Sequence, residues 1–287
     1  MRSYMPSIEK NIEFWKQSYD WSGGGDEWSR NWGGPDMQWY ATLLPRMQAF
    51  LPAKAILEIA PGFGRWTQFL RDLCETLIGV DLNENCVESC KSRFASSPNL
   101  QFFVNDGKSL PMVRDESIDF IVSFDSLVHV EADVIDAYLK EFRRVLTKNG
   151  VGVIHHSNYG NCLPTRPMRK FRRVLSKLAP INNLNPHWRA ESMTAEKFAD
   201  SCRRHDLQCI SQEMINWDGN VLCDCISVFT NSQSEFRQSN VITKNRRFMK
   251  EAANAKAMSS MYGRKRFDRN PKDRNGQPVP AVAQAPR

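Results

Sequence analysis

Residues Ile56–Thr67, ILEIAPGFGRWT, are the part of this 287-residue chain that indicates its fold most clearly. An apolar strand breaks at Gly62 and Gly64, and a helical pattern begins directly after them. Glycine lets a ligand approach the backbone closely, and the first turn of a helix offers free N–H groups. The stretch therefore predicts a ligand-binding loop at the carboxyl end of a buried strand.

The sequence on either side of this loop alternates between short apolar runs and helical patterns. Such alternation predicts right-handed βαβ units and a mostly parallel, doubly wound α/β sheet with helices on both faces. Residues 207–217 and 221–230 predict a closing antiparallel hairpin, which makes seven strands. The five earlier strands are expected at 55–60, 77–82, 100–105, 118–124 and 151–157, with helices at 65–74, 83–94, 133–148 and 194–205.

Three regions differ in composition. Residues 1–52 are rich in aromatic side chains and predict a lid followed by a helix over 36–50. Residues 53–230 form the α/β domain, with an insertion at 160–190. Residues 231–287 are basic and rich in Pro and Gln towards their end, so we expect a disordered tail. The lid contains Trp15, Trp21, Trp28 and Trp32 around a run of glycines.

The charge, cysteine and hydropathy patterns exclude several classes of protein. The net charge of +7 comes from the segment after residue 240, so the rest of the chain is near neutral and binding of nucleic acid is disfavoured. No apolar run is long enough to cross a bilayer, and the first residues do not resemble a signal peptide. The eight cysteines form no CxxC pair and no histidine lies at zinc-finger spacing, so we predict reduced thiols and no metal site. The missing membrane span and signal peptide predict a cytoplasmic location.

Carboxylates lie at the ends of the first three predicted strands. Asp81 follows Gly64 by 17 residues, where it can accept hydrogen bonds from the ribose hydroxyls of an adenosine. Asp106 ends the third strand and could accept a hydrogen bond from the adenine amino group, with Gly107 leaving room for the ring. A nicotinamide dinucleotide would need a third glycine at Thr67, and the negative charge of Glu58 disfavours its phosphates.

This ordered set resembles the class I S-adenosylmethionine-dependent methyltransferases, which have a Rossmann-like fold, over roughly residues 53–230. The resemblance implies that Glu58 faces the methionine ammonium, Asp81 holds the ribose and Asp106 contacts adenine. Ala60 replaces the first loop glycine of the family and is followed by Pro61. The implied cofactor is S-adenosyl-L-methionine, held by Glu58, Ala60, Gly62, Gly64, Thr67, Asp81, Leu82, Asp106, Gly107 and Phe124.

The methyl acceptor should meet residues that follow the fourth and fifth strands, because ligands of such sheets bind beyond the strand ends. An alcohol acceptor must lose a proton, and a histidine can accept it. His155 and His156 point to opposite faces of their strand, so one of them is expected to face the cleft, and a packed structural role is the alternative for each. The candidate catalytic residues are Asp125, His129, His155 and His156; Asp125 with a histidine could instead bind a divalent cation.

We therefore predict O-methylation of a small metabolite or a saccharide. The basic insertion, with Arg166, Arg169, Lys170, Arg172, Arg173 and Lys177, could attract an anionic or polyhydroxylated acceptor, and Trp28, Trp32 or Trp188 could stack on sugar rings. The alternatives are N- or S-methylation of another metabolite, a nucleic-acid or protein methyltransferase that uses the basic tail, and a cofactor-binding regulator without enzymatic activity.

Overall fold

The structure, a computed structural model, describes residues 7–162, 188–217 and 219–262. Its described strands form one sheet in the order β3-β2-β1-β4-β5-β7-β6-β8. The chain order reverses between β1 and β4, and both pair in parallel, so a crevice opens where their carboxyl ends meet. The strands are β1 (Ala53–Ile59), β2 (Cys74–Asp81), β3 (Leu100–Val104), β4 (Ile118–Ser123), β5 (Leu146–Ser157), β6 (Leu207–Ile215), β7 (Asp224–Asn231) and β8 (Val241–Asn245).

Helices cover both faces of the sheet, as the alternating pattern predicts. Leu57 and Ile59 of β1 point to one face, where they belong to a buried cluster with Leu139 and Phe198. Ile56 points to the other face, in a cluster that includes Val87. The first face is covered by α6 (Ala132–Val145) and α8 (Ala195–Arg204), and the second by α4 (Thr67–Leu70), α5 (Glu84–Arg93) and the helical residues 35–50. The predicted Rossmann-like α/β fold is confirmed.

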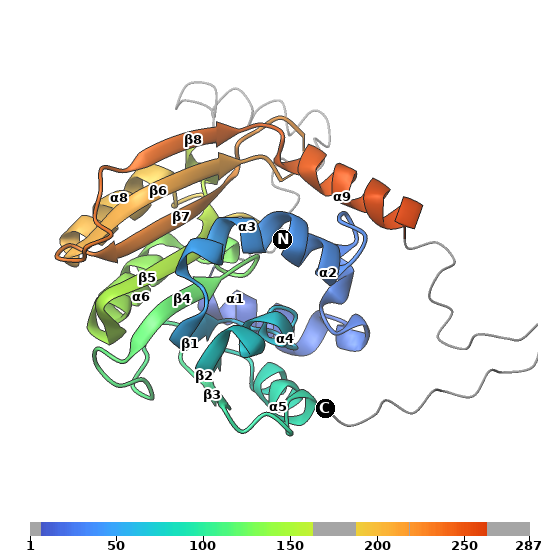
Figure 1. Ribbon diagram of the computed structural model, residues 1–287, viewed down its shortest axis with the longest axis horizontal. Helices are drawn as coiled ribbons and strands as arrows, with labels where there is room; N and C mark the ends of the chain where they lie inside the picture. Colours follow the sequence, from blue (N-terminus) through green and yellow to red (C-terminus); the bar gives the residue numbers. More distant parts are fainter. Residues whose placement is uncertain (1–6, 163–187, 218, 263–287) are drawn as a thin grey trace, which may run out of the picture.

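The C-terminal region contains more regular structure than its composition predicts. β8 pairs in parallel with β6, with Ser211 opposite Val241, and α9 (Phe248–Tyr262) follows it and runs beside α2 (Pro35–Gln38) (Figure 1). Phe248 is fully buried, and its ring meets that of Trp32 at 6.0 Å. These tertiary contacts lie outside the local pattern, and the residues of β8 are mostly exposed, so neither element was predicted. Residues 263–287 of the expected tail lie outside the described residues.

The N-terminal residues fold over the carboxyl edge of β1 and β2. α1 (Ile8–Ile12) begins the described chain, and a continuous helical stretch runs from α2 through a π-helical turn at Trp39–Leu43 to α3 (Leu44–Met47), close to the predicted range of 36–50. Trp32 is fully buried and donates a hydrogen bond to Thr42 Oγ1 at 2.9 Å. Within the described ranges, no helix combines the length and the apolar character that crossing a membrane requires.

Candidate active site

Left-handed backbone shapes the loop that follows β1. Ala60, Gly62 and Gly64 have φ angles of 56°, 59° and 84°. A Cβ atom on Gly64 would lie 2.5 Å from Cε2 of Phe94, and one on Gly62 would lie 3.3 Å from the Trp21 ring. Gly64 is therefore required for packing against α5, and Gly62 for the approach of the N-terminal segment.

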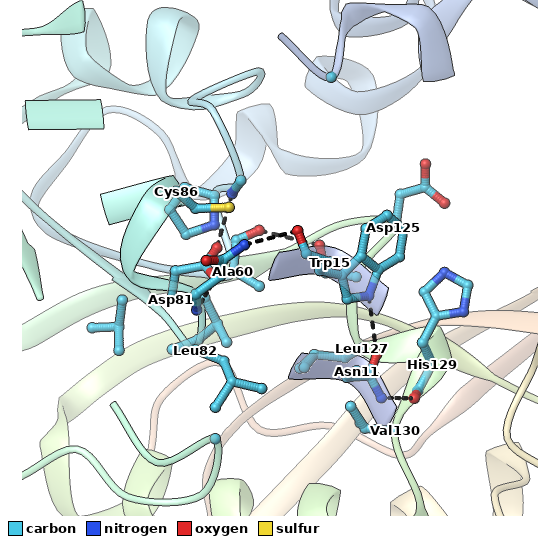
Figure 2. A pocket seen from close by; sticks show the side chains of 18 of the residues that line it. Asn11, Trp15, Ala60, Asp81, Leu82, Cys86, Asp125, Leu127, His129 and Val130 are labelled. Atoms are coloured by element: carbon cyan, nitrogen blue, oxygen red, sulfur yellow. Dashed lines mark hydrogen bonds between the residues drawn. The ribbon is translucent and has the colours of Figure 1, made fainter. Parts of the chain in front are cut away.

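A pocket lies between this loop, the ends of β2 and β4, and the N-terminal segment. Figure 2 shows Asp81 and Cys86 on one side, Asp125 and His129 on the other, and Trp15 between them. Trp21 and Trp28 also line the pocket, so aromatic rings form much of its wall. The pocket brings together six of the residues predicted to hold a cofactor, which are Ala60, Gly62, Asp81, Leu82, Gly107 and Phe124.

Asp81 is held at the end of β2 by backbone donors. Its Oδ2 accepts a hydrogen bond from the Gly62 N–H at 3.0 Å, and its Oδ1 accepts one from the Asn83 N–H at 2.8 Å. Burial raises the pKa of Asp81 to about 6, although these hydrogen bonds lower it. Each carboxylate oxygen retains a further lone pair, so the side chain can still accept hydrogen bonds from ligand hydroxyls.

Glu58 and Arg65 place two unpartnered atoms of opposite charge beside the loop. Glu58 Oε2 accepts a hydrogen bond from Thr67 Oγ1 at 2.6 Å, whereas its Oε1 is buried and has no hydrogen-bond partner among the described residues. Burial raises the pKa of Glu58 to about 7. Arg65 Nη2 donates to Asp125 Oδ2 at 3.1 Å, and its buried Nη1 likewise has no described partner. Because buried polar atoms are nearly always hydrogen-bonded, we expect a bound ligand to supply the missing partners of both atoms.

Glu58, Gly64, Thr67 and Asp106 do not line the pocket themselves. Glu58 and Thr67 lie behind the loop and contact each other, and Gly64 packs on α5. Asp106 is exposed, and its carboxylate accepts hydrogen bonds from the backbone N–H groups of Lys108 and Ser109 and from Ser109 Oγ. The structure therefore does not bring Asp106 to the position expected for an adenine contact, because the turn that follows β3 uses its oxygens.

The structure corrects the expectation that His155 or His156 faces the cleft. Both are fully buried and neither lines the pocket. His156 stacks on Phe198 at 4.3 Å, its Nδ1 lies 2.9 Å from Ser157 O, and its Nε2 lies 2.8 Å from Ser227 Oγ. Burial lowers the pKa of His156 to about 4. β7 pairs with β5 from Val151 to Ser157, and Trp217 and Phe198 pack on the rings of His155 and His156; these long-range contacts are absent from the local pattern.

His129 and Asp125 are the two predicted catalytic residues that the structure brings into the pocket. His129 Nδ1 lies 3.3 Å from Trp188 O, and because a carbonyl oxygen can only accept, Nδ1 carries the proton. Its Nε2 is buried and has no described hydrogen-bond partner. Burial and, to a smaller extent, the charge of Arg189 lower the pKa of His129 to about 4. His129 is therefore neutral at pH 7, with a free lone pair on Nε2.

The lid is anchored by polar residues that the sequence analysis did not single out. Asn11 Nδ2 donates to His129 O at 2.9 Å, and Trp15 Nε1 donates to Asn11 Oδ1 at 3.1 Å. Asn83 Nδ2 donates to Trp15 O at 3.0 Å. These contacts join the lid to both sides of the pocket. Arg65 was also missed, although its place directly after Gly64 was a usable signal.

The aromatic and basic groups predicted to attract a sugar are only partly in place. Trp28 lines the pocket, whereas Trp32 is buried in the core and Trp188 is 39% exposed and absent from the pocket lining. The basic residues at positions 166–177 lie outside the described residues.

Comparisons with known proteins agree with this geometry. Residues 56–150 match the family model of a methyltransferase domain. Demethylmenaquinone methyltransferases from two strains of Staphylococcus epidermidis are each 30% identical over 141 residues, which is 48% of this chain and 54% of the relative. The chain thus spans about half the length of the curated relatives it matches.

Two solved structures share the fold. A SAM-dependent methyltransferase from Leishmania major is 12% identical, with a TM-score of 0.53, and the match covers 78% of this chain and 82% of that one. A putative sarcosine dimethylglycine methyltransferase from Galdieria sulphuraria is 14% identical, with a TM-score of 0.51, and the match covers 69% of this chain and 86% of that one. At these identities the likeness concerns the fold.

Proposed function

We propose that this chain, which carries an S-adenosylmethionine-dependent methyltransferase domain, transfers a methyl group to a hydroxyl of a small metabolite or a saccharide. The proposal rests on three buried atoms without a described hydrogen-bond partner: Arg65 Nη1 and His129 Nε2 belong to residues that line the pocket, and Glu58 Oε1 lies behind its loop. The Glu58 and Arg65 atoms suit the amino acid end of the cofactor, and His129 Nε2 suits a proton taken from the acceptor.

The residues beside the loop fit S-adenosylmethionine. Its amino acid end carries an ammonium and a carboxylate, and Glu58 and Arg65 offer one complementary charge each. Asp81 would accept hydrogen bonds from the ribose hydroxyls, and Gly107 would leave space for adenine beside Leu82. When bound, the cofactor supplies an electrophilic methyl group on a sulfonium. The aromatic lid would exclude water from that group, as displacement reactions require.

His129 would accept the proton of the acceptor hydroxyl. Its Nε2 lone pair is available at neutral pH, because burial holds its pKa near 4 and Trp188 O fixes the proton on Nδ1. Asp125, on the same side of the pocket, raises the pKa of His129 and would stabilise the imidazolium that forms. A base with so low a pKa accepts a proton only as the oxygen becomes methylated, so most of the rate enhancement would come from alignment.

The pocket wall favours an acceptor with a flat or apolar face. Trp15, Trp21 and Trp28 surround a few convergent polar groups, an arrangement that suits the apolar faces of sugar rings. A second candidate reaction is methylation of an aromatic ring carbon. It is suggested by the relatives from Staphylococcus epidermidis, which are named demethylmenaquinone methyltransferases. A quinol-type acceptor would stack on these rings in the same way.

The test is to incubate the purified chain with methyl-labelled S-adenosylmethionine and with fractionated metabolite, glycan, quinol, protein and nucleic-acid extracts. The proposal predicts labelled products in which the methyl group is bound to oxygen, as judged by mass spectrometry. A label on a ring carbon would favour the second candidate. Label in protein or nucleic acid that disappears on deletion of residues 263–287 would favour a tail-directed methyltransferase, and no label in any fraction would contradict the proposal.

A further inference from the structure

A chain of buried hydrogen bonds connects β7 with the pocket residue Asp125. Arg189 binds the Asp224 carboxylate through two nitrogens, with Nε 2.9 Å from Oδ1 and Nη2 2.7 Å from Oδ2. His155 Nε2 lies 3.2 Å from Asp224 Oδ2, and the Asp125 N–H donates to His155 Nδ1 at 3.1 Å. Each of these four residues is at most 8% exposed. None of these hydrogen bonds is used by the proposed reaction.

The Asp224 carboxylate determines which nitrogen of His155 carries the proton. Burial raises the pKa of Asp224, but Arg189 and His155 together more than reverse this effect, so the pKa lies well below its usual range and the side chain is ionised. An ionised carboxylate can only accept, so His155 Nε2 donates to it. Nδ1 is then left with a lone pair that can accept from Asp125. The ring packs against two aromatic rings that also contact each other, Phe124 at 4.5 Å and Trp217 at 5.2 Å.

Asp125 has an unusual backbone conformation that the hydrogen bond to His155 helps to hold. Its φ of 66° lies in the left-handed region, which residues other than glycine rarely adopt. It comes two residues after β4 ends at Ser123, so its N–H points away from the sheet hydrogen bonding and meets His155 instead. Its carboxylate meets Arg65 Nη2 at 3.1 Å. The backbone of Asp125 is thus fixed from one side and its side chain from the other.

We propose that His155 is a positioning residue that holds Asp125, and through it Arg65, in place for the amino acid end of the cofactor. Asp224 and Arg189 act one step further away, because they fix the tautomer in which His155 can accept from Asp125. The link to ligand binding rests on the proposed function, whereas the tautomer and the hydrogen bond to Asp125 do not.

The first experiment measures the tautomer directly in the full-length chain. Long-range ¹H–¹⁵N spectra of ¹⁵N-histidine-labelled protein at neutral pH, assigned with the H155N variant, are expected to show His155 with a protonated Nε2 and an unprotonated Nδ1. A protonated Nδ1 would overturn the proposal, because that nitrogen could not accept from Asp125. This result does not depend on any ligand, so it stands apart from a failure of the proposed function.

The second experiment compares two substitutions of equal polarity. In H155N the amide oxygen takes the place of Nδ1 and can still accept from Asp125, whereas in H155Q the amide reaches the place of Nε2 and leaves the Asp125 N–H without an acceptor. We expect H155Q to weaken S-adenosylhomocysteine binding by about tenfold and H155N by less than about threefold. The two variants should lose similar amounts of thermal stability, as measured by Tm. Neither variant should weaken 5′-methylthioadenosine, which lacks the amino acid end that Arg65 would contact.

Equal weakening of S-adenosylhomocysteine binding by H155N and H155Q would overturn the positioning role, and so would equal weakening of both ligands. If the wild-type chain binds neither ligand, the proposed function fails, and the tautomer measurement alone decides the structural part of the inference.

Discussion

The Asp81 carboxylate accepts a hydrogen bond from the Gly62 N–H at 3.0 Å and so joins the end of β2 to the loop after β1. Both groups line the same pocket, and Gly62 has a φ of 59°. The residue that would hold the ribose therefore also fixes the loop that would wrap the cofactor. A change at either position acts on both functions.

The loop geometry predicts a specific loss of stability in G64A. The new methyl group would overlap Phe94, and alanine at a φ of 84° adds backbone strain, so we expect a loss of about 2 to 4 kcal/mol in the free energy of unfolding. Urea unfolding measures it. In the control G219A, φ is similar at 69° but no atom lies within 4 Å, so its loss should be about 1 kcal/mol. Equal losses in the two variants would show that the Phe94 contact is not the cause.

The two unpartnered charges predict ligand-specific effects. R65M and E58Q should weaken the binding of S-adenosylhomocysteine by about tenfold or more, because each removes a charge that the proposed function assigns to the amino acid end of the ligand. Both variants should bind 5′-methylthioadenosine within about threefold of wild type, since this ligand carries neither the ammonium nor the carboxylate. Titration calorimetry of each variant with both ligands provides the comparison, and equal losses for the two ligands would refute the assignment.

Cofactor affinity should fall as the pH is lowered. Burial raises the pKa of Glu58 to about 7 and of Asp81 to about 6, so both side chains are largely ionised at pH 8 and largely protonated at pH 5. A ligand ammonium and ribose hydroxyls favour the ionised forms, so S-adenosylhomocysteine should bind roughly 20-fold more weakly at pH 6 than at pH 8. Calorimetry in buffers of different ionisation heat should detect proton release near pH 6.5.

The E58Q variant separates the two contributions to this pH dependence. Without the Glu58 carboxyl, only Asp81 titrates, and the loss between pH 8 and pH 6 should shrink to about twofold. An unchanged loss in E58Q would mean that another group controls the pH dependence.

His129 should affect turnover far more than cofactor binding. With an acceptor identified by the labelling experiment, H129Q should lower kcat by about 100-fold or more, because the amide has no basic lone pair, while the affinity for S-adenosylhomocysteine stays within about threefold. The control H205Q changes a histidine at the end of α8 that pairs with Asp136, away from the pocket, and should retain turnover. Full turnover in H129Q would favour an acceptor that needs no base, as in N- or S-methylation.

Local patterns were sufficient for most of the fold and for part of the site. The apolar runs predicted the strands β1 to β7, because each buries its own side chains, and the glycine loop and Asp81 were found because their chemistry depends on short spacings. β8 escaped prediction because its stability comes from pairing with β6 rather than from its own apolar residues.

The assignment of the histidines required tertiary contacts. One of His155 and His156 was expected to face the cleft because both lie near the end of the fifth strand, but the rings of Trp217 and Phe198 pack on them and β7 pairs alongside. The free nitrogen of His129 depends on Trp188, which is 59 residues away in the sequence. Contacts over such distances decide which of several similar side chains is left free for chemistry.

A calorimetric titration of wild type and D81A with S-adenosylhomocysteine at pH 8 tests whether Asp81 holds the ribose in this pocket. We expect one site per chain for wild type and binding at least tenfold weaker for D81A, which loses both the ribose acceptor and the hydrogen bond to Gly62. If the wild-type chain does not bind, or if the two proteins bind equally well, the pocket is not the cofactor site proposed here.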